Sequence, residues 1–409
     1  MKIPELLAPA GSFEKAKTAF KYGADAVYCG TGKLSLRSRS EVDDNDLEKT
    51  IEYAHNIGKK VYAALNIYAF DESYDDIETQ IKMLSKMKVD GVIASDGGVI
   101  AKIKEIDPNL SINISTQANV VSWHSAKFWY DNGAKRIILG REVSKDQIEE
   151  IIKNKPQDLE IEIFIHGALC WAYSGRCFLS NYLSNRSANL GDCSQSCRWA
   201  YNMYIEEKNN PGQMMPVETD ENGTYILSSK DLCLVEELPQ IIDMGIDSLK
   251  IEGRLKTEYY LASVVKAYRA AIDDYIKNPK EYDYKKYMVE LDKITTRSLT
   301  KFYFNDRNNQ DIGEYEGKQY NPNFEFGGKV LKVEDNFAIV EIKNKLSVGD
   351  TIEILIPNTI DVENFKIEEL KETDTNENID TINPGKIGQT VKIKIPFEVE
   401  EGIILRRKK

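Results

Sequence analysis

Four cysteines lie close together in the middle of the chain and have the chemistry of metal ligands. They are separated by six, fifteen and three residues, with a fifth thirty-six residues further on: Cys170, Cys177, Cys193, Cys197 and Cys233. Converging thiolates outside a disulfide framework usually hold zinc or an iron–sulfur cluster. Structural zinc sites favour tight CxxC pairs, which this sequence lacks, so the wide spacing favours a cluster without excluding zinc. A set of buried free cysteines is the alternative.

The elements that must position these thiols have an alternating pattern. Residues 1–276 contain eight short apolar runs, which read as strands: 5–10, 26–29, 61–66, 91–95, 112–117, 136–140, 161–166 and 248–252. Amphipathic stretches typical of helices lie between them, for example 47–57, 77–87, 122–132 and 147–153. Eight evenly spaced strand–helix units predict an α/β fold with a (β/α)8 TIM-like barrel, in preference to an open doubly wound sheet.

A barrel of this kind carries its reactive groups at the C-terminal ends of the strands. The polar residues expected there are Asn66, Asp96, Ser115, Gln117, Arg141, Glu142, His166, Glu252 and Arg254. Two-residue alternation along the seventh and eighth strands also points Glu162, His166 and Lys250 into the barrel. Because an unpaired buried charge is costly, we expect Lys250 to pair with Glu162.

The connection after the seventh strand is much longer than usual. It runs from residue 167 to 229, carries four of the six cysteines, and replaces a loop that normally has about two to six residues. Residues 277–323 then read as a helical and connecting segment. From 324 to 409, short alternating runs separated by turn residues predict a small C-terminal β-barrel domain.

The charge balance limits the classes of partner. With 54 Lys and Arg against 66 Asp and Glu, the net charge is −12, which argues against a protein that coats nucleic acid through its bulk charge. A local basic site remains compatible with that balance. No apolar run approaches the roughly eighteen residues of a membrane helix, and the first residues lack a secretory signal pattern, so we expect a cytoplasmic protein with no membrane partner.

One motif in the seventh strand and the loop after it is specific enough to indicate a family. It reads Glu162-x-Phe164-x2-Gly167-Ala168-Leu169-Cys170-x4-Gly175-x-Cys177-x-Leu179-Ser180. This pattern resembles the signature of the collagenase-like peptidase family U32. Further segments resemble the same family, among them GDCSQSCRW at 191–199, SSKDLC at 228–233 and LKIEGRLKTEYY at 249–260. The resemblance spans nearly the whole chain.

The resemblance implies a redox enzyme that acts on RNA. The two-domain arrangement is most similar to the branch of tRNA hydroxylation proteins, which form 5-hydroxyuridine at the wobble position and depend on prephenate. Family members of this kind carry a 4Fe–4S cluster. Carried over to this sequence, the implied ligands are Cys170, Cys177, Cys193 and Cys233, with Cys197 as the alternative fourth ligand. Cys233 is preferred because SSKDLC is expected to open a helix above the barrel mouth.

The same resemblance leaves two other functions open. The family name implies proteolysis, and His166 with Cys170 would be the base and the nucleophile. However, the sequence has neither an HExxH zinc helix nor a GxSxG elbow. A non-catalytic iron–sulfur scaffold is the third reading. We expect the hydroxylase acting on tRNA. Ribosomal RNA stays open as the substrate, and the length and the C-terminal domain favour tRNA over a quinone.

The resemblance and the barrel topology together assign roles to individual residues. The expected catalytic residues are His166, Glu252 and Arg254, the last as a clamp for a carboxylate. The expected substrate-binding residues are Asn66, Gln117, Arg141, Arg176, Arg198 and Lys250.

The expected partner is a tRNA anticodon loop, whose splayed base would stack on an aromatic ring. The candidates for stacking are Trp171, Tyr173, Trp199 and Tyr201, and the basic end of the chain, 406–409, is a candidate RNA contact. An oligomer with itself or with a family paralogue is also possible.

Overall fold

The closed barrel predicted from the sequence forms the body of the molecule. The computed structural model describes residues 2–35, 41–170, 172–199, 201, 203–206, 208, 211–212, 214–217, 229–294, 297–306, 323–334 and 337–409. Its eight parallel barrel strands are β1 (Glu5–Pro9), β2 (Ala26–Thr31), β4 (Lys60–Ala64), β5 (Gly91–Ala94), β6 (Ile112–Ile114), β7 (Ala134–Ile138), β8 (Glu160–Ala168) and β12 (Ser248–Ile251). β12 pairs with both β1 and β8, which closes the ring. Each of the eight predicted runs overlaps one of these strands.

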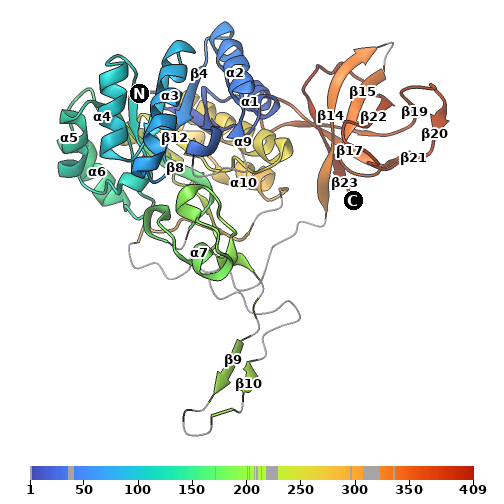
Figure 1. Cartoon of the computed structure of the whole chain (residues 1–409). Helices are drawn as coiled ribbons and strands as arrows, with labels where there is room; N and C mark the ends of the chain where they lie inside the picture. The colour runs from blue at the N-terminus through green and yellow to red at the C-terminus, as the bar shows by residue number, and fades with distance from the viewer. Residues whose placement is uncertain are drawn as a thin grey trace.

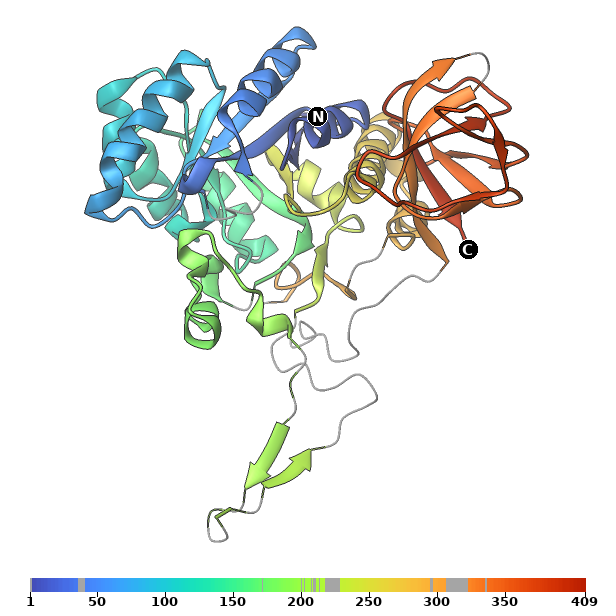
Figure 2. The ribbon, with the colours of Figure 1, turned by 45° about the vertical axis from the view of Figure 1, so that its right-hand side comes forward.

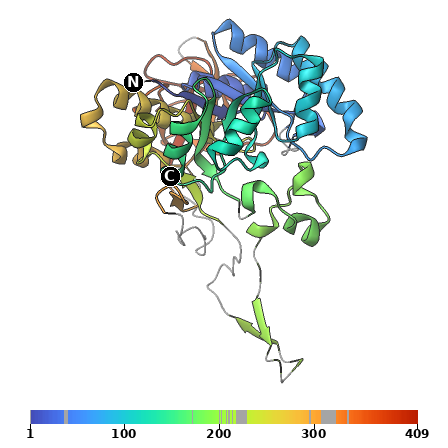
Figure 3. The same cartoon turned by 90° about the vertical axis from the view of Figure 1, so that its left-hand side faces the viewer.

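Helices cover the outside of the barrel, as Figures 1 and 3 show. They are α1 (Phe13–Lys21), α2 (Asp44–Asn56), α3 (Tyr74–Lys86), α4 (Gly97–Ile106), α5 (Trp123–Asp131), α6 (Lys145–Asn154), α8 (Leu238–Asp243) and α9 (Glu258–Lys277). Their apolar faces pack on the outward side chains of the strands in one continuous core, which places the hydrophobic driving force between the two layers. Among the described residues, no helix is both long and apolar enough to cross a membrane.

The long segment after β8 has its own small elements. β8 runs on through Ala168, so the insertion begins after that residue, and it contains the short helix α7 (Leu179–Ser184). A hairpin of β9 (Met203–Glu206) and β10 (Met214–Val217) stands away from the barrel in Figures 1 and 2. The chain returns through β11 (Asp231–Cys233), which pairs antiparallel with the end of β8 and parallel with β13 (Leu299–Thr300). Cys233 therefore ends a strand, where the sequence predicted the start of a helix.

The C-terminal part of the chain forms an antiparallel sheet with its own apolar core. Its strands are β14 (Phe324–Glu334), β15 (Phe337–Ile342), β17 (Thr351–Leu355), β18 (Val362–Lys366), β19 (Leu370–Glu372), β20 (Asn378–Ile379), β22 (Thr390–Lys394) and β23 (Ile404–Lys408). A separate pair joins β16 (Leu346–Ser347) to β21 (Thr381–Ile382). Figure 2 shows this sheet beside α9 and α10 (Tyr284–Leu291) of the barrel part.

A buried ionic cluster joins the sheet to the barrel. Arg406 of β23 is fully buried and donates to Glu290 of α10 at 2.9 and 3.0 Å and to Glu353 of β17 at 2.5 and 2.8 Å. The Tyr22 hydroxyl of the barrel part accepts from the Ile404 nitrogen and donates to the Leu355 carbonyl. Arg406 is thus part of an interior contact, and the expectation that the basic end of the chain contacts RNA is wrong at this residue.

We expect the Arg406→Met substitution to destabilise the protein strongly, because the buried carboxylates of Glu290 and Glu353 lose their closest cation and keep only lysine contacts. Breaking a buried pair in this way costs about 3–5 kcal/mol. Urea unfolding followed by circular dichroism measures the loss. Lys408→Met, at an exposed position of the same strand, is the matched control and should change the free energy of unfolding by less than about 0.5 kcal/mol. Equal stability of the two variants would contradict a supporting role for the cluster.

Candidate active site

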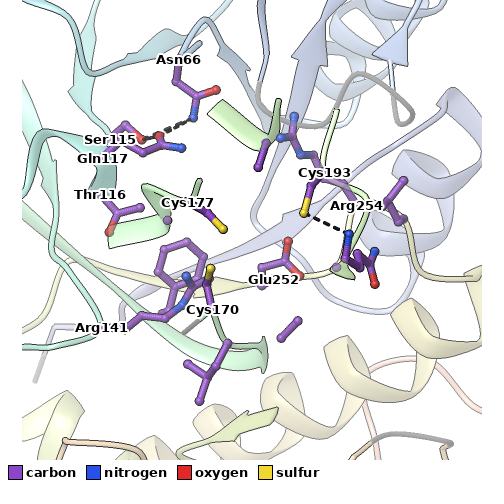
Figure 4. Close-up of a pocket in the computed structure, with 18 of the residues that line it drawn as sticks. Asn66, Ser115, Thr116, Gln117, Arg141, Cys170, Cys177, Cys193, Glu252 and Arg254 are labelled. Atoms are coloured by element: carbon purple, nitrogen blue, oxygen red, sulfur yellow. Dashed lines mark hydrogen bonds between the residues drawn. The ribbon is translucent and has the colours of Figure 1, made fainter. Parts of the chain in front are cut away.

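A cavity of about 330 Å³ opens at the C-terminal ends of the barrel strands, where the topology predicted the reactive groups. Its walls come from the barrel and from the long insertion, and Figure 4 shows many of its side chains. The polar and charged residues lining it are Asn66, Ser115, Thr116, Gln117, Arg141, Ser180, Gln195, Ser196, Arg198, Lys250, Glu252, Arg254 and Lys256. Four cysteines line it as well: Cys170, Cys177, Cys193 and Cys197.

All four thiols line this cavity, and the other three lie near enough to Cys197 to act on its charge. Burial raises the pKa of the Cys197 thiol, and the sulfurs of Cys170, Cys193 and Cys177 raise it further, while Arg198 opposes the rise. Side-chain hydrogen bonds hold the loop: the Asn189 amide accepts from the Cys177 nitrogen at 3.1 Å and donates to the Cys177 carbonyl at 3.0 Å. The insertion therefore presents four sulfurs to one space.

Cys233, which the resemblance ranked above Cys197, does not line this cavity. Its sulfur is buried 3.7 Å from the Tyr268 hydroxyl and 3.9 Å from the Met288 sulfur. The cause is the antiparallel pairing of β11 with the end of β8, which sets Cys233 against α9 and α10. The structure thus gathers Cys197, and not Cys233, with the other three thiols.

The spacing of the thiols bears on which metal they suit. Within the described part of the chain, no three His, Cys, Asp or Glu side chains converge tightly enough to hold one metal ion. A zinc ion needs its four ligands around a single atom, whereas a cubane cluster takes each thiolate at a separate iron. The structure thus brings four thiols to one cavity without gathering three of them around a single point in the part of the chain that it describes.

Cationic groups occupy the floor and rim of the cavity. Lys250 pairs with Glu162 at 2.8 Å and lies 4.3 Å from the centre of the Tyr28 ring, which confirms the predicted pairing. The Arg141 guanidinium stacks 3.8 Å from the centre of the Phe164 ring, and burial lowers its pKa against the opposing charge of Glu252. These groups, with Arg254 near Tyr28, make the interior attractive to anions.

Further ion pairs of Arg136 support the Lys250–Glu162 pair. Glu162 also accepts from Arg136 at 3.1 Å, and Arg136 pairs with Glu5 at 2.7 Å and with Glu160 at 2.7 Å. Burial lowers the pKa of Arg136, but the neighbouring carboxylates of Glu162 and Glu5 raise it by more, so the net shift is upward. These carboxylates therefore hold Lys250 and Arg136 in place, while Arg141, Arg254 and Lys256 add further positive charge to the lining of the cavity.

Three polar side chains face the cations across the cavity, as Figure 4 shows. Asn66 donates its amide to the Gln117 carbonyl oxygen at 2.9 Å, and Ser115 donates to the same oxygen at 2.5 Å. Two donors on one oxygen fix the orientation of the Gln117 amide. This wall can therefore hydrogen-bond to a polar ring.

The remaining predicted residues divide between the cavity and its support. Arg198 lines the cavity and donates to the Leu169 carbonyl at 3.1 Å. Arg176 does not line it and instead donates to the Gln117 backbone carbonyl at 2.5 Å, so it supports the wall. Asp96 caps α4 through the nitrogens of Gly98 and Val99.

His166 does not line the cavity, which corrects its prediction as a catalytic residue of the barrel mouth. The register of β8 against β12 shifts between Phe164 and His166, so strict alternation fails there. The ring lies against Tyr260 and Tyr268 of α9, and its Nδ1 is 3.4 Å from the Tyr268 hydroxyl. Burial lowers the pKa of His166 to about 3, with Lys256 contributing, so the ring is neutral at physiological pH.

The aromatic residue Tyr28 on the cavity wall was missed from the sequence, whereas Lys256 is among the basic residues expected at the barrel mouth. Tyr28 lies on the inward face of β2. The two-residue alternation along that strand could have identified it. Lys256 follows Arg254 by two residues and lies 5.1 Å from the Tyr260 ring centre. Of the aromatic candidates, Trp171 lies outside the described residues. Tyr173 and Trp199 are exposed outside the cavity, and the Tyr201 hydroxyl donates to the Ser196 carbonyl.

Comparison with known proteins agrees with the motif. Peptidase family U32 matches residues 11–313, and the C-terminal domain of peptidase family U32 matches residues 322–406. The chain is 37% identical to the tRNA hydroxylation protein P1 of Bacillus subtilis (strain 168), covering 100% of this chain and 96% of that protein. It is also 37% identical to the tRNA hydroxylation protein P of Escherichia coli (strain K12), covering 97% and 95%.

A third relative is a 23S rRNA 5-hydroxycytidine synthase of Escherichia coli (strain K12), which is 33% identical over 91% of this chain and 55% of that protein. The family match extends over most of the residues, and it includes both the cysteine-bearing barrel and the C-terminal sheet. On these matches, the chain belongs to peptidase family U32.

Proposed function

We propose that this protein hydroxylates the wobble uridine of tRNA to 5-hydroxyuridine in the cytoplasm, using a 4Fe–4S cluster and prephenate. The observation that carries the proposal is the cavity itself, in which four thiols, a cationic floor and an amide wall share one space. Relatives named as tRNA hydroxylation proteins, and one named for 5-hydroxycytidine in 23S rRNA, support the reaction class.

The residues proposed to hold the cluster are Cys170, Cys177, Cys193 and Cys197. When bound, such a cluster supplies the one-electron chemistry that amino acid side chains lack. The insertion carries the thiols on loops held by side-chain hydrogen bonds, so the barrel strands need not deform to accept the cluster. Cys233 is the alternative fourth ligand and would have to leave its contacts with Tyr268 and Met288.

The cationic side of the cavity is the proposed site for prephenate, a small molecule with two carboxylates. Arg254 and Arg141 offer planar guanidinium groups, which bind carboxylates through paired hydrogen bonds. Lys250 and Lys256 add positive charge at the floor and the rim. Arg254 is buried and Arg141 is partly buried, which strengthens these contacts because fewer water molecules compete for the anion.

The amide wall is the proposed site for the uracil ring. Gln117, held by Asn66 and Ser115, presents a fixed amide to a ring that carries both carbonyl and N–H groups. Glu252 lines the same cavity and is the proposed base for a proton lost from the ring. A base that reaches this depth has to leave the RNA stack, as bases in an anticodon loop can do.

The peptidase alternative is weaker on this geometry. None of the described residues lining the cavity is a histidine, and His166 is buried against α9. Cys170 therefore lies close to other thiols, which suits a set of metal ligands better than a nucleophile paired with a base.

Mass spectrometry of nucleosides tests the proposed reaction. In bulk tRNA from a strain that lacks this gene and any close paralogue, we expect 5-hydroxyuridine and its derivatives to be lost. The wild-type gene should restore them and Cys170→Ala should not, because the cluster would lose a ligand. Cys233→Ala, a cysteine change outside the cavity, should restore them. Unchanged tRNA in the deletion strain would refute the function.

Iron content and the visible absorption of anaerobically purified protein test the ligand set. We expect Cys197→Ala to lose most of the iron and the broad absorption near 400 nm, because an unfilled corner destabilises the cluster. Cys233→Ala should retain both. The opposite pattern would show that Cys233 moves into the cavity when the cluster binds, and zinc in place of iron would refute the cofactor.

The buried state of His166 predicts its titration. Its imidazole signals in nuclear magnetic resonance spectra should not change between about pH 5 and pH 8. The unfolded chain binds the proton that the folded chain excludes. Acidification from pH 6.5 toward about pH 3 should therefore lower the free energy of unfolding. A titration of the ring near neutral pH would revive its role as a catalytic base.

A further inference from the structure

Large aromatic side chains are exposed on the insertion beside the cavity. Phe178 and Tyr182 are 79% and 85% exposed, and Tyr173 and Trp199 are 54% and 42% exposed. Burying such rings in water-free contacts is favourable, so a cluster of exposed rings on one segment indicates a surface that a partner covers. None of the four rings is assigned to the proposed cluster site or to the proposed site of the uracil ring.

Phe178 and Tyr182 share one side of α7. Phe178 precedes the first residue of the helix, and its carbonyl accepts from the Tyr182 nitrogen at 2.9 Å, so the two side chains lie one helical turn apart. The intervening Leu179 and Ser180 line the cavity. One side of this short helix thus faces the cavity and an adjoining edge carries the two exposed rings.

The charge around these rings favours an anionic partner. Between residues 170 and 199 the chain has three arginines, one aspartate and no lysine or glutamate, against a net charge of −12 for the whole chain. Arg186 pairs with Asp192 at 2.5 Å, while Arg176 and Arg198 donate to neutral oxygens and keep their charge. The stretch from residue 170 to 199, which carries the exposed rings, therefore has a small excess of positive charge on an acidic protein.

We propose that Phe178 and Tyr182 form a stacking platform for unpaired nucleotides of the RNA loop whose base enters the cavity. Single-stranded nucleic acid binds to surfaces that combine aromatic rings with positive charge, because each base has a face that stacks. Tyr173 and Trp199 are further exposed rings of the same insertion. The inference rests on the proposed function, since it assigns the neighbouring nucleotides of that substrate.

The test uses the anaerobically purified protein with its cofactor and an unmodified anticodon stem–loop RNA with uridine at the wobble position. Fluorescence anisotropy measures the dissociation constant. We expect Phe178→Ser and Tyr182→Ser each to weaken binding by roughly 5- to 100-fold, from the loss of one stacked base. Phe178→Tyr and Tyr182→Phe keep a ring and should bind as the wild type does.

Phe128→Ser is the matched control, because Phe128 is 58% exposed on α5 of the barrel and lies outside the insertion. It should leave RNA binding unchanged. Unchanged melting temperatures for the Phe178 and Tyr182 variants would show that they fold normally. Wild-type RNA affinity in the double serine variant would overturn the platform, and so would an equal loss in the ring-preserving variants.

Two outcomes distinguish the stacking platform from a protein contact and from the proposed hydroxylation. If the double serine variant changes the oligomeric state in size-exclusion chromatography while its RNA affinity is unchanged, the rings contact protein and the platform is refuted. If the wild type binds the RNA loop through the rings but tRNA in cells lacks 5-hydroxyuridine, the platform stands and the proposed reaction fails.

Discussion

The pairing of β8 with β12 closes the barrel, and the site depends on it. Glu162 of β8 and Lys250 of β12 join across this pair at 2.8 Å in the barrel interior, and Arg136 of β7 extends the contact. A buried ion pair is worth little against an apolar substitute, but losing one partner costs about 3–5 kcal/mol. Here the pair fixes a position, because it holds the Lys250 ammonium group against the Tyr28 and Phe164 rings.

The insertion forms a second wall of the cavity from loops, above the barrel strands. Near the end of β8, Gly167 has a φ of +109°, and a Cβ atom there would lie 2.4 Å from the Glu252 carbonyl oxygen. The thiols then follow in segments stabilised by side-chain hydrogen bonds, such as those of Asn189 with Cys177. A barrel floor with a loop wall suits a site that must accept both a small anion and a base drawn from an RNA loop.

Much of this arrangement could be predicted because periodic patterns are local. The eight strands, the Lys250–Glu162 pair, and the placement of Asn66, Gln117 and Glu252 at the strand ends all follow from alternation and topology. His166 could not be placed in this way, because a register shift in β8 reverses the side that alternation assigns. Cys233 and Arg406 depend on tertiary partners, namely β11 against β8 and the contact between the sheet and the barrel, which no local pattern encodes.

The central claim is that four thiols of the insertion hold an iron–sulfur cluster inside the barrel cavity. Anomalous diffraction at the iron absorption edge, from crystals grown without oxygen, tests it most directly. The account predicts a compact iron peak between Cys170, Cys177, Cys193 and Cys197, above the floor formed by Lys250. A cavity without iron, a single zinc ion, or iron bound through Cys233 in place of Cys197 would contradict it.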